Sequence, residues 1–342
     1  MGENKRVKKG MRRRRANDFW QRFLNGEILG GLFDKKMLFD IDFALLFSKY
    51  VEVVNIETST FCNRRCEYCP LSNNDRGSAK KFMDKEIFLK ILQELKSIDY
   101  NQSISLNLYN EPLASDNIYE RISQVREYLP HAYIIFNSNG DYVNKEVLQR
   151  LSDCGLNALS ISLHANKEYR DKDRQKAIFR FFTKIQLDYE VTNFAENKNI
   201  TVIKKIHDSF ELKVMTNNWS EYGNDRAGSA IVNFKSNRIH PCMKPIREFT
   251  ISCDGVVVPC CNFFPDSQIA RKYNVGNIVD RTLFQLYNSE IMIFFRRGLF
   301  SFSDKFEPCN HCNDLDNALV DTQEDRMKIL NTKEQINKKK LL

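Results

Sequence analysis

The chain has 342 residues, of which 42% are hydrophobic and 28% are charged, with only 13 glycines and 8 prolines. This composition excludes a wholly disordered or fibrous protein and suits two domains, or one large domain with an extension. No apolar run approaches the roughly 18 residues that a membrane-spanning helix needs, so we expect no membrane span.

The net charge of +8 is concentrated at the amino terminus. Residues 1–15 hold eight Lys or Arg and one acid, so this arm carries +7 and the remaining 327 residues carry +1. A nearly neutral remainder does not indicate a broad basic face for nucleic acid. We expect a solvated arm, with contact to RNA or to an anionic membrane as the less favoured alternative. No apolar segment of a secretory signal follows it.

Between residues 51 and 235 the chain alternates strand-like and helix-like segments. Asp84 and Asn144 stand where N-caps are expected, and Gly155 stands where a helix should end. Such alternation predicts an α/β fold with a parallel sheet, either open or closed into a barrel. The predicted strands are 51–58, 103–109, 132–137, 158–163 and 201–206; the predicted helices begin after Asp84 and Asn144 and cover 116–128 and 167–190; a weaker helix and strand continue the pattern to about residue 234.

Parallel α/β folds place their chemistry at the carboxyl ends of the strands. Four chemically capable residues follow four of the predicted strands, so we expect them to line one face of the sheet. His164 is more often a hydrogen-bonded rim residue than a catalyst, and it is assigned no role. The four residues are Cys62, Glu111, Asn139 and His164.

The clustering of the ten cysteines is more informative than their number. The chain length, the missing secretory signal and the tight spacing favour metal binding in a reducing cytoplasm over disulfides. Cys62, Cys66 and Cys69 lie in one loop just past the first predicted strand. Three thiolates can hold a cubane [4Fe–4S] cluster and leave one iron open to a small molecule. Zinc is the alternative for a CxxC pair, and it would need a fourth ligand.

This C-x₃-C-x₂-C loop, with Tyr68 before its last cysteine and a strand before its first, closely resembles the signature of the radical S-adenosylmethionine (SAM) superfamily. The resemblance extends over residues 51–320 and implies a partial (β/α)6 barrel similar to a TIM barrel. It also implies that the open iron chelates the amino and carboxylate groups of SAM. Reductive cleavage then gives a 5′-deoxyadenosyl radical that abstracts hydrogen from a substrate. A flavodoxin or ferredoxin is the implied electron donor.

Four further residues receive roles from the same resemblance. Glu111, in a segment similar to the family's GEP, is expected to hold the methionyl ammonium of SAM. Asn139, in a segment similar to TNG, is expected near the ribose. Ser162 is expected to reach the ribose or carboxylate, and Tyr68 to pack near the adenine. The alternatives are that Glu111 is a turn residue that ends a strand and that Asn139 belongs to a generic turn.

The stretch 236–320 differs from the rest, because it is rich in cysteine and lacks long alternating helices. Two β-rich runs flank Asp254-Gly255, which predicts a hairpin. We expect a small second domain built around metal.

Four cysteines of this stretch can form a closed four-thiolate site. Cys261 is the alternative ligand to its neighbour Cys260. The pattern resembles the SPASM/twitch extension that holds auxiliary [4Fe–4S] clusters. The single-cluster twitch form fits better, because the cysteine run of a two-cluster domain is absent. A structural zinc site is the alternative. The four cysteines are Cys242, Cys260, Cys309 and Cys312.

The resemblance leaves the substrate open. The absence of a leader-binding winged domain and of a Gly-Gly tail favours two-electron oxidation of a small-molecule or sugar-type substrate. A peptide- or protein-modifying maturase is the alternative, and an iron–sulfur electron carrier or nucleic-acid-binding protein is the non-enzymatic alternative. Arg226, near the sixth predicted strand, is a candidate substrate contact, with a surface loop arginine as the equal alternative. The expected divisions are a basic arm and extension over 1–50, a radical SAM core over 51–235, an auxiliary-cluster domain over 236–320 and a charged tail over 321–342.

Overall fold

Most of the chain is described by the computed structural model, and no helix in that part is long and apolar enough to cross a membrane. The basic arm over residues 1–15, His164 and the tail over 321–342 lie outside the described residues. These are 29–33, 40–78, 80–163, 171–196, 198–219, 223–230, 237–300 and 302–314.

The centre of the fold is a ten-stranded sheet with the order β10-β9-β8-β1-β2-β3-β4-β7-β6-β5. From β8 to β7 the neighbouring strands run parallel, and the outer pairs run antiparallel. The predicted α/β class with a mostly parallel sheet is confirmed. The strands are β1 (Val53–Ile56), β2 (Ser103–Ser105), β3 (Tyr133–Ser138), β4 (Ala158–Ser162), β5 (Asn193–Ala195), β6 (Asn199–His207), β7 (Phe210–Asn217), β8 (Glu248–Ile251), β9 (Val256–Val258) and β10 (Gly276–Asn277).

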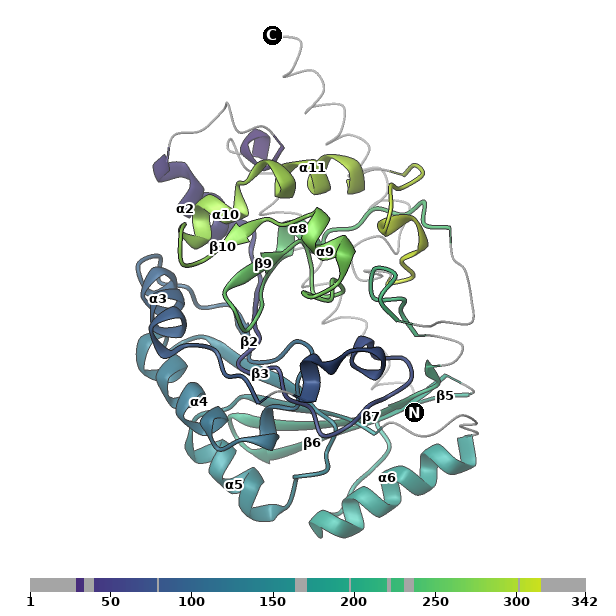
Figure 1. Cartoon of the computed structure of the whole chain (residues 1–342). Coiled ribbons are helices and arrows are strands. Elements are labelled where there is room, and N and C mark those ends of the chain that lie inside the picture. Colours follow the sequence, from purple (N-terminus) through teal and green to yellow (C-terminus); the bar gives the residue numbers. More distant parts are fainter. Residues whose placement is uncertain are drawn as a thin grey trace.

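Helices cover the outer side of the parallel strands (Figure 1). Two of them begin where the sequence predicts. The Asp84 carboxylate accepts two amides of the first turn of α3, at 2.7 and 3.2 Å, and Asn144 Oδ1 accepts the Val147 amide of α5 at 2.8 Å. Such caps satisfy amides that have no partner within the helix. The helices are α2 (Asp40–Tyr50), α3 (Lys85–Lys96), α4 (Asn117–Tyr128), α5 (Lys145–Asp153), α6 (Asp171–Ile185), α8 (Lys244–Arg247), α9 (Gln268–Lys272), α10 (Leu283–Tyr287) and α11 (Glu290–Leu299).

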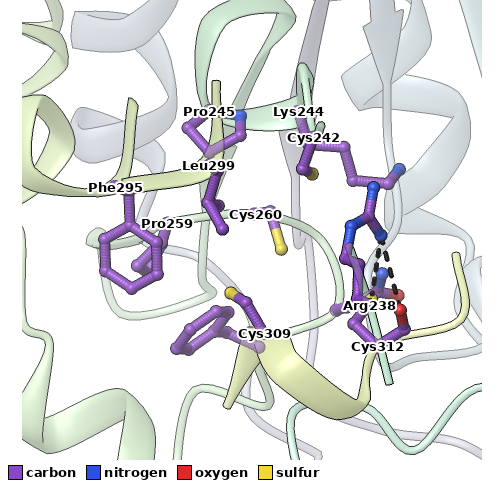
Figure 2. A pocket seen from close by; sticks show the side chains of 12 residues that line it. Arg238, Cys242, Lys244, Pro245, Pro259, Cys260, Phe295, Leu299, Cys309 and Cys312 are labelled. Atoms are coloured by element: carbon purple, nitrogen blue, oxygen red, sulfur yellow. Dashed lines mark hydrogen bonds between the residues drawn. The ribbon is translucent and has the colours of Figure 1, made fainter. Parts of the chain in front are cut away.

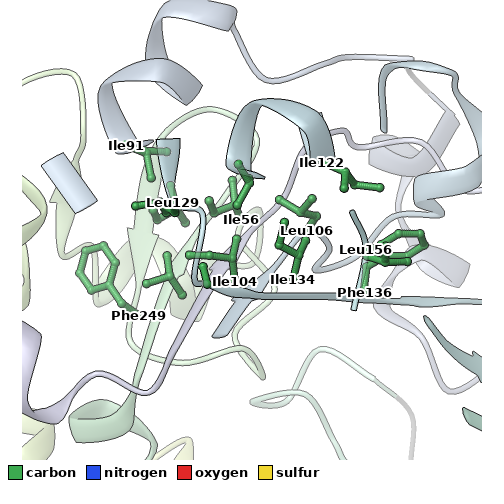
Figure 3. Close-up of a cluster of buried hydrophobic side chains, with 14 of the residues drawn as sticks. Ile56, Ile91, Ile104, Leu106, Ile122, Leu129, Ile134, Phe136, Leu156 and Phe249 are labelled. Carbon is green, nitrogen blue, oxygen red and sulfur yellow. The ribbon is translucent and has the colours of Figure 1, made fainter. Parts of the chain in front are cut away.

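The two faces of the sheet differ in polarity. Ile56, Ile104 and Ile134, from three neighbouring strands, are fully buried in the hydrophobic core beneath the helices (Figure 3). Successive residues of a strand point to opposite faces of the sheet, so the strand residues next to these isoleucines lie on the inner face. There Asn55 Nδ2 donates to Thr250 Oγ1 over 3.1 Å. The inner face is therefore polar, which suits binding of a polar ligand.

The regular alternation ends at β6. The prediction of a helix after residue 206 is wrong, because a two-residue turn at Asp208 and Ser209 leads directly into β7, which pairs antiparallel with β6. Buried and partly exposed residues alternate along the whole of β7, which suits a strand with one covered face. β7 then pairs in parallel with β4. The expected core thus supplies five of the six parallel strands among the described residues, and β8 supplies the sixth.

The predicted hairpin around Asp254-Gly255 is present as β8 and β9, and Gly255 has the left-handed φ of 76° that the turn requires. However, β8 also pairs in parallel with β1. The sheet therefore continues across the boundary expected near residue 236. Phe47 of α2 packs against Phe249 and Tyr287, both with ring centroids 5.3 Å away, so segments before and after the core meet at this edge.

Candidate functional site

The first three cysteines lie in a loop that leaves the carboxyl end of β1. Cys69 N donates to Cys66 O over 2.9 Å, and Cys62 N donates to Gly77 O over 3.2 Å, so backbone hydrogen bonds fold the loop. All three thiols are half-buried. Burial raises the pKa of Cys62 to about 11, so a bound metal has to displace its proton. Three thiols in one loop fit a cluster that keeps one iron open.

The cysteine loop is fastened to the turn that follows β3. Arg64 forms a two-point ion pair with Asp141, with 2.8 Å between Nε and Oδ2, and Asn63 Nδ2 donates to the same oxygen at 2.8 Å. Asn139 Nδ2 donates to Asn63 Oδ1 at 2.7 Å, and its Oδ1 accepts the Asp141 amide at 2.9 Å. Asn139 thus lies beside the cysteine loop, as predicted for the strand ends, and both polar ends of its side chain have protein partners.

Glu111 is buried beneath the same turn, with 2% of its surface exposed. Its Oε1 accepts Ser138 Oγ at 2.8 Å and Leu113 N at 3.1 Å, and its Oε2 accepts Asn139 N at 2.7 Å. The Glu111 amide donates to Phe61 O at 2.8 Å. Burial raises the pKa of this carboxyl, and its hydrogen bonds oppose that effect. The carboxylate therefore holds the turn after β3 in place.

Replacing Glu111 by glutamine is expected to lower the free energy of unfolding by about 1–3 kcal/mol, because an amide N–H₂ would face donors that now point at a carboxylate. Urea unfolding of the cluster-free protein measures this change. Glu120→Gln, on an exposed side chain of α4, is the matched control and should alter stability by less than about 0.5 kcal/mol. Equal midpoints for the two variants would contradict the assigned role of Glu111.

An aromatic pair connects the cysteine loop with the far strand of the parallel set. The rings of Tyr68 and Trp219 stack with centroids 5.1 Å apart and an interplanar angle of 13°. Trp219 lies just past β7, and Ser162 ends β4 opposite Met215 of β7. Tyr68 and Ser162 are thus both at the end of the sheet where the cysteine loop lies. Trp219 could not be predicted from the sequence, because a single aromatic residue carries no spacing pattern.

The second group of cysteines lines one pocket, shown in Figure 2. The sulfur atoms of Cys260 and Cys309 point into the space between the four residues. The empty volume is about 320 Å³, including its opening to solvent. Pro259, Phe295 and Leu299 supply apolar walls. The lining cysteines are the four predicted ones, Cys242, Cys260, Cys309 and Cys312.

Cys261, the rival of Cys260, is not among the residues that line this pocket. Lys244 Nζ donates to its sulfur over 3.6 Å and to Glu248 Oε1 over 2.8 Å. Cys260 and Cys261 lie in the turn after β9, where Phe263 N donates to Cys260 O over 3.1 Å, and within this turn the two thiols have different surroundings.

Nitrogen donors surround the cysteine pocket. Arg238 Nη1 lies 3.7 Å from Cys312 Sγ, and Asn224 Nδ2 lies 3.6 Å from the same sulfur. Hydrogen bonds to sulfur tune iron–sulfur clusters and compensate thiolate charge. Among the described residues, no three His, Cys, Asp or Glu side chains converge as ligands of one metal ion do. Four thiols around one pocket, with nitrogen donors beside them, fit an iron–sulfur cluster.

Tyr109 and Arg226 lie in the region between the two cysteine groups. Tyr109 was predicted in a strand but lies in the loop after β2, with its hydroxyl 3.3 and 3.1 Å from the carbonyl oxygens of Cys261 and Asn262. Arg226 Nη1 donates to Asn262 Oδ1 over 2.6 Å. Arg226 also lies within electrostatic range of Cys69, from the first group, and of Cys261, the neighbour of the pocket residue Cys260. The structure therefore places Arg226 between the groups.

Comparison with known families agrees with this arrangement. The model of the radical SAM superfamily matches residues 56–186, which include the first cysteine loop. The model of SPASM, an iron–sulfur cluster-binding domain, matches residues 242–313, which include all four cysteines of the pocket.

The chain is also similar to individual proteins, over different shares of its length. The chain is 26% identical over 277 residues to the S-adenosyl-L-methionine-dependent 2-deoxy-scyllo-inosamine dehydrogenase of Niallia circulans, covering 81% of this chain and 97% of that enzyme. A GTP 3′,8-cyclase of Clostridium perfringens (strain SM101 / Type A) is 28% identical over 152 residues, 44% of this chain and 45% of the cyclase. The crystal structure of BtrN in complex with AdoMet and 2-DOIA superposes with a TM-score of 0.55 at 22% identity, covering 80% of this chain and 96% of BtrN.

The predicted family, fold and cofactors are confirmed by these matches. The cysteine loop after β1, the partial barrel and the cysteine-rich pocket follow one another in the order that the two family models require. The chain therefore belongs to the radical SAM superfamily, as an enzyme that uses a SAM-binding [4Fe–4S] cluster and an auxiliary iron–sulfur cluster in a carboxyl-terminal SPASM domain.

Proposed function

We propose that this enzyme is a dehydrogenase that oxidises a secondary alcohol of a small, hydroxylated ring compound, such as an aminocyclitol, to a ketone. The observation that carries the proposal is the alignment with the 2-deoxy-scyllo-inosamine dehydrogenase across 97% of that enzyme. The single four-cysteine pocket beside the barrel also supports it, because such an oxidation needs one electron acceptor near the substrate. The cyclase of Clostridium perfringens (strain SM101 / Type A) matches over only 45% of its length, so it supports the shared core only.

The balance of the reaction defines what the protein must provide. When bound, SAM and its cluster supply a 5′-deoxyadenosyl radical that takes the carbon-bound hydrogen, and the auxiliary cluster accepts the remaining electron. The hydroxyl proton is released, so two electrons and two hydrogens leave the alcohol. The chain's own residues orient the two reactants and exclude water from them.

The residues that bind the first cluster and SAM are assigned by their position at the sheet end. Cys62, Cys66 and Cys69 are proposed to hold the SAM cluster, supported by their common loop at the carboxyl end of β1. Tyr68 and Ser162 are proposed to contact the adenine and the ribose or carboxylate of SAM, supported by their place at the same sheet end.

Two further residues are proposed to face SAM. The carboxylate of Glu111 retains one lone-pair site, on Oε2, beyond its three hydrogen bonds, and this site is proposed to accept the methionyl ammonium. Asn139, fixed by Asn63 and by the carboxylate of Glu111, is proposed to lie near the ribose.

The auxiliary ligands are proposed to be Cys242, Cys260, Cys309 and Cys312, supported by their common pocket. Arg226 is proposed to contact the substrate; its place between the cysteine groups and its left-handed φ of 51° support a positioned residue.

The expected divisions at residues 51, 236 and 320 remain proposals, as do a flavodoxin or ferredoxin donor and a location in the cytoplasm.

The decisive experiment uses the anaerobically reconstituted, reduced enzyme with SAM and 2-deoxy-scyllo-inosamine. We expect 5′-deoxyadenosine and the amino-ketone in equal amounts, with deuterium transferred to 5′-deoxyadenosine from the labelled carbinol carbon. A panel of other aminocyclitols tests the substrate class. Oxidation of none of them would contradict the dehydrogenase proposal and favour the maturase alternative.

A further inference from the structure

A buried arginine connects the first cysteine loop with the auxiliary region. Arg76 lies in the short 3₁₀ helix Asp75–Ser78, and its side chain is 5% exposed. Its Nη2 donates to Glu57 Oε2 at 2.5 Å, and its Nη1 donates to Asp266 Oδ1 at 2.7 Å. Glu57 follows β1 directly, whereas Asp266 lies six residues after Cys260. One guanidinium group therefore spans the barrel and the auxiliary region.

The 3₁₀ helix that carries Arg76 also supports the backbone of the cysteine loop. Cys62 N donates to Gly77 O over 3.2 Å, and Arg65 Nη2 donates to Ser78 Oγ over 2.7 Å. A Cβ atom on Gly77 would lie only 3.1 Å from the Arg65 guanidinium, so the two segments are closely packed. A shift of Arg76 would consequently move the loop that bears the first cysteines.

Glu57 extends the connection to two more segments. It is fully buried, and its Oε2 accepts the amide of Cys253 in the β8–β9 turn at 2.9 Å. Its Oε1 accepts the amide of Tyr109 at 3.3 Å. A buried carboxylate is tolerated only when it is paired and hydrogen-bonded, so these contacts depend on the guanidinium of Arg76.

We infer that Arg76 is a positioning residue that fixes the separation of the two cluster sites and thereby couples SAM cleavage to substrate oxidation. Hydrogen abstraction and electron acceptance must act on one substrate held between the two sites. A small displacement of either site therefore lowers the yield of product far more than it lowers SAM binding. The coupling rests on the proposed function, whereas the fixed separation does not.

The test compares Arg76→Gln with Asp266→Asn, which breaks only the auxiliary half of the connection at a carboxylate that is 39% exposed. Arg126→Gln is the matched control, because Arg126 likewise makes several hydrogen bonds, but to carbonyl oxygens and at the opposite end of the sheet. The amount of product per 5′-deoxyadenosine should fall roughly 100-fold in Arg76→Gln, less in Asp266→Asn, and not in the control. SAM should still alter the spectrum of the first cluster in all three.

Two readouts need no substrate. Pulsed electron paramagnetic resonance of the reduced enzyme should show a broader distribution of distances between the clusters in Arg76→Gln. Amide exchange at Cys253 and Tyr109 should become roughly tenfold faster in the cluster-free protein. Compared with Arg76→Gln, Arg76→Lys should restore the cluster distances and the amide exchange rates only in part, because a point cation cannot bridge two carboxylates.

Unchanged cluster distances and amide exchange in Arg76→Gln and Asp266→Asn would overturn the inference. If Arg76→Gln fails to fold, Asp266→Asn alone decides, because its side chain lies near the surface. If no aminocyclitol is oxidised but distances and exchange change as expected, the dehydrogenase proposal fails and the positioning role stands.

Discussion

Simultaneous replacement of Cys62, Cys66 and Cys69 by alanine is expected to abolish formation of 5′-deoxyadenosine from SAM. These thiols share one loop at the carboxyl end of β1, and without them no iron with an open position remains. The auxiliary pocket should be unaffected and should retain about four irons with matching sulfide after anaerobic reconstitution. Iron, sulfide and zinc analysis together with chromatography of the SAM products measures both expectations.

Cys154→Ala is the matched control for this triple variant. Cys154 is half-buried at the end of α5 and packs against the core, so its loss should leave the metal content and SAM cleavage unchanged. Two results would contradict the assignments in different ways. Continued SAM cleavage by the triple variant would refute the first cluster site. Retention of zinc without iron or sulfide would identify the second site as structural zinc.

The second large effect is expected when Cys260 is replaced by serine, and the same replacement of its neighbour Cys261 is the comparison. Cys260 lines the four-cysteine pocket, whereas Cys261 does not and contacts Lys244 instead. Cys260→Ser should lower the total iron from about eight to about four per chain and eliminate substrate oxidation, while SAM cleavage continues. Cys261→Ser should retain both clusters.

This pair is informative because the two positions are adjacent and share their backbone environment. A general folding defect would affect both variants alike, whereas loss of a ligand affects one. If Cys261→Ser lost the auxiliary cluster and Cys260→Ser kept it, the ligand assignment would be reversed. If Cys260→Ser oxidised the substrate at the normal rate, the auxiliary cluster would not be the electron acceptor.

Local sequence features predicted the elements that depend on neighbouring residues. Asp84 and Asn144 cap their helices through amides two or three residues away. The spacing of Cys62, Cys66 and Cys69 defines a single loop, and a loop can be recognised without knowledge of the rest of the chain. For the same reason the Asp254-Gly255 turn was predicted correctly.

The predictions that failed concern which strands pair with one another. The alternation of apolar and polar residues along a strand specifies which face of the strand is buried, but it does not specify the neighbouring strand. The antiparallel pairing of β6 with β7 was therefore not predicted. The parallel pairing of β8 with β1 was missed for the same reason, since residues 195 positions apart meet there. Cys260 was predicted with Cys261 as its rival, and only the fold shows that Cys260 lines the pocket and Cys261 does not.

By itself the sequence determined the family, the three-cysteine loop and the capped helices, because each depends on short-range spacing or on residue chemistry. Only the tertiary structure decided that the auxiliary region extends the barrel sheet, that Tyr109 and Arg226 lie between the cysteine groups, and that Arg76 joins Glu57 to Asp266. These contacts unite segments distant in the chain. Their geometry follows from how the whole sheet closes and packs, which no local pattern encodes.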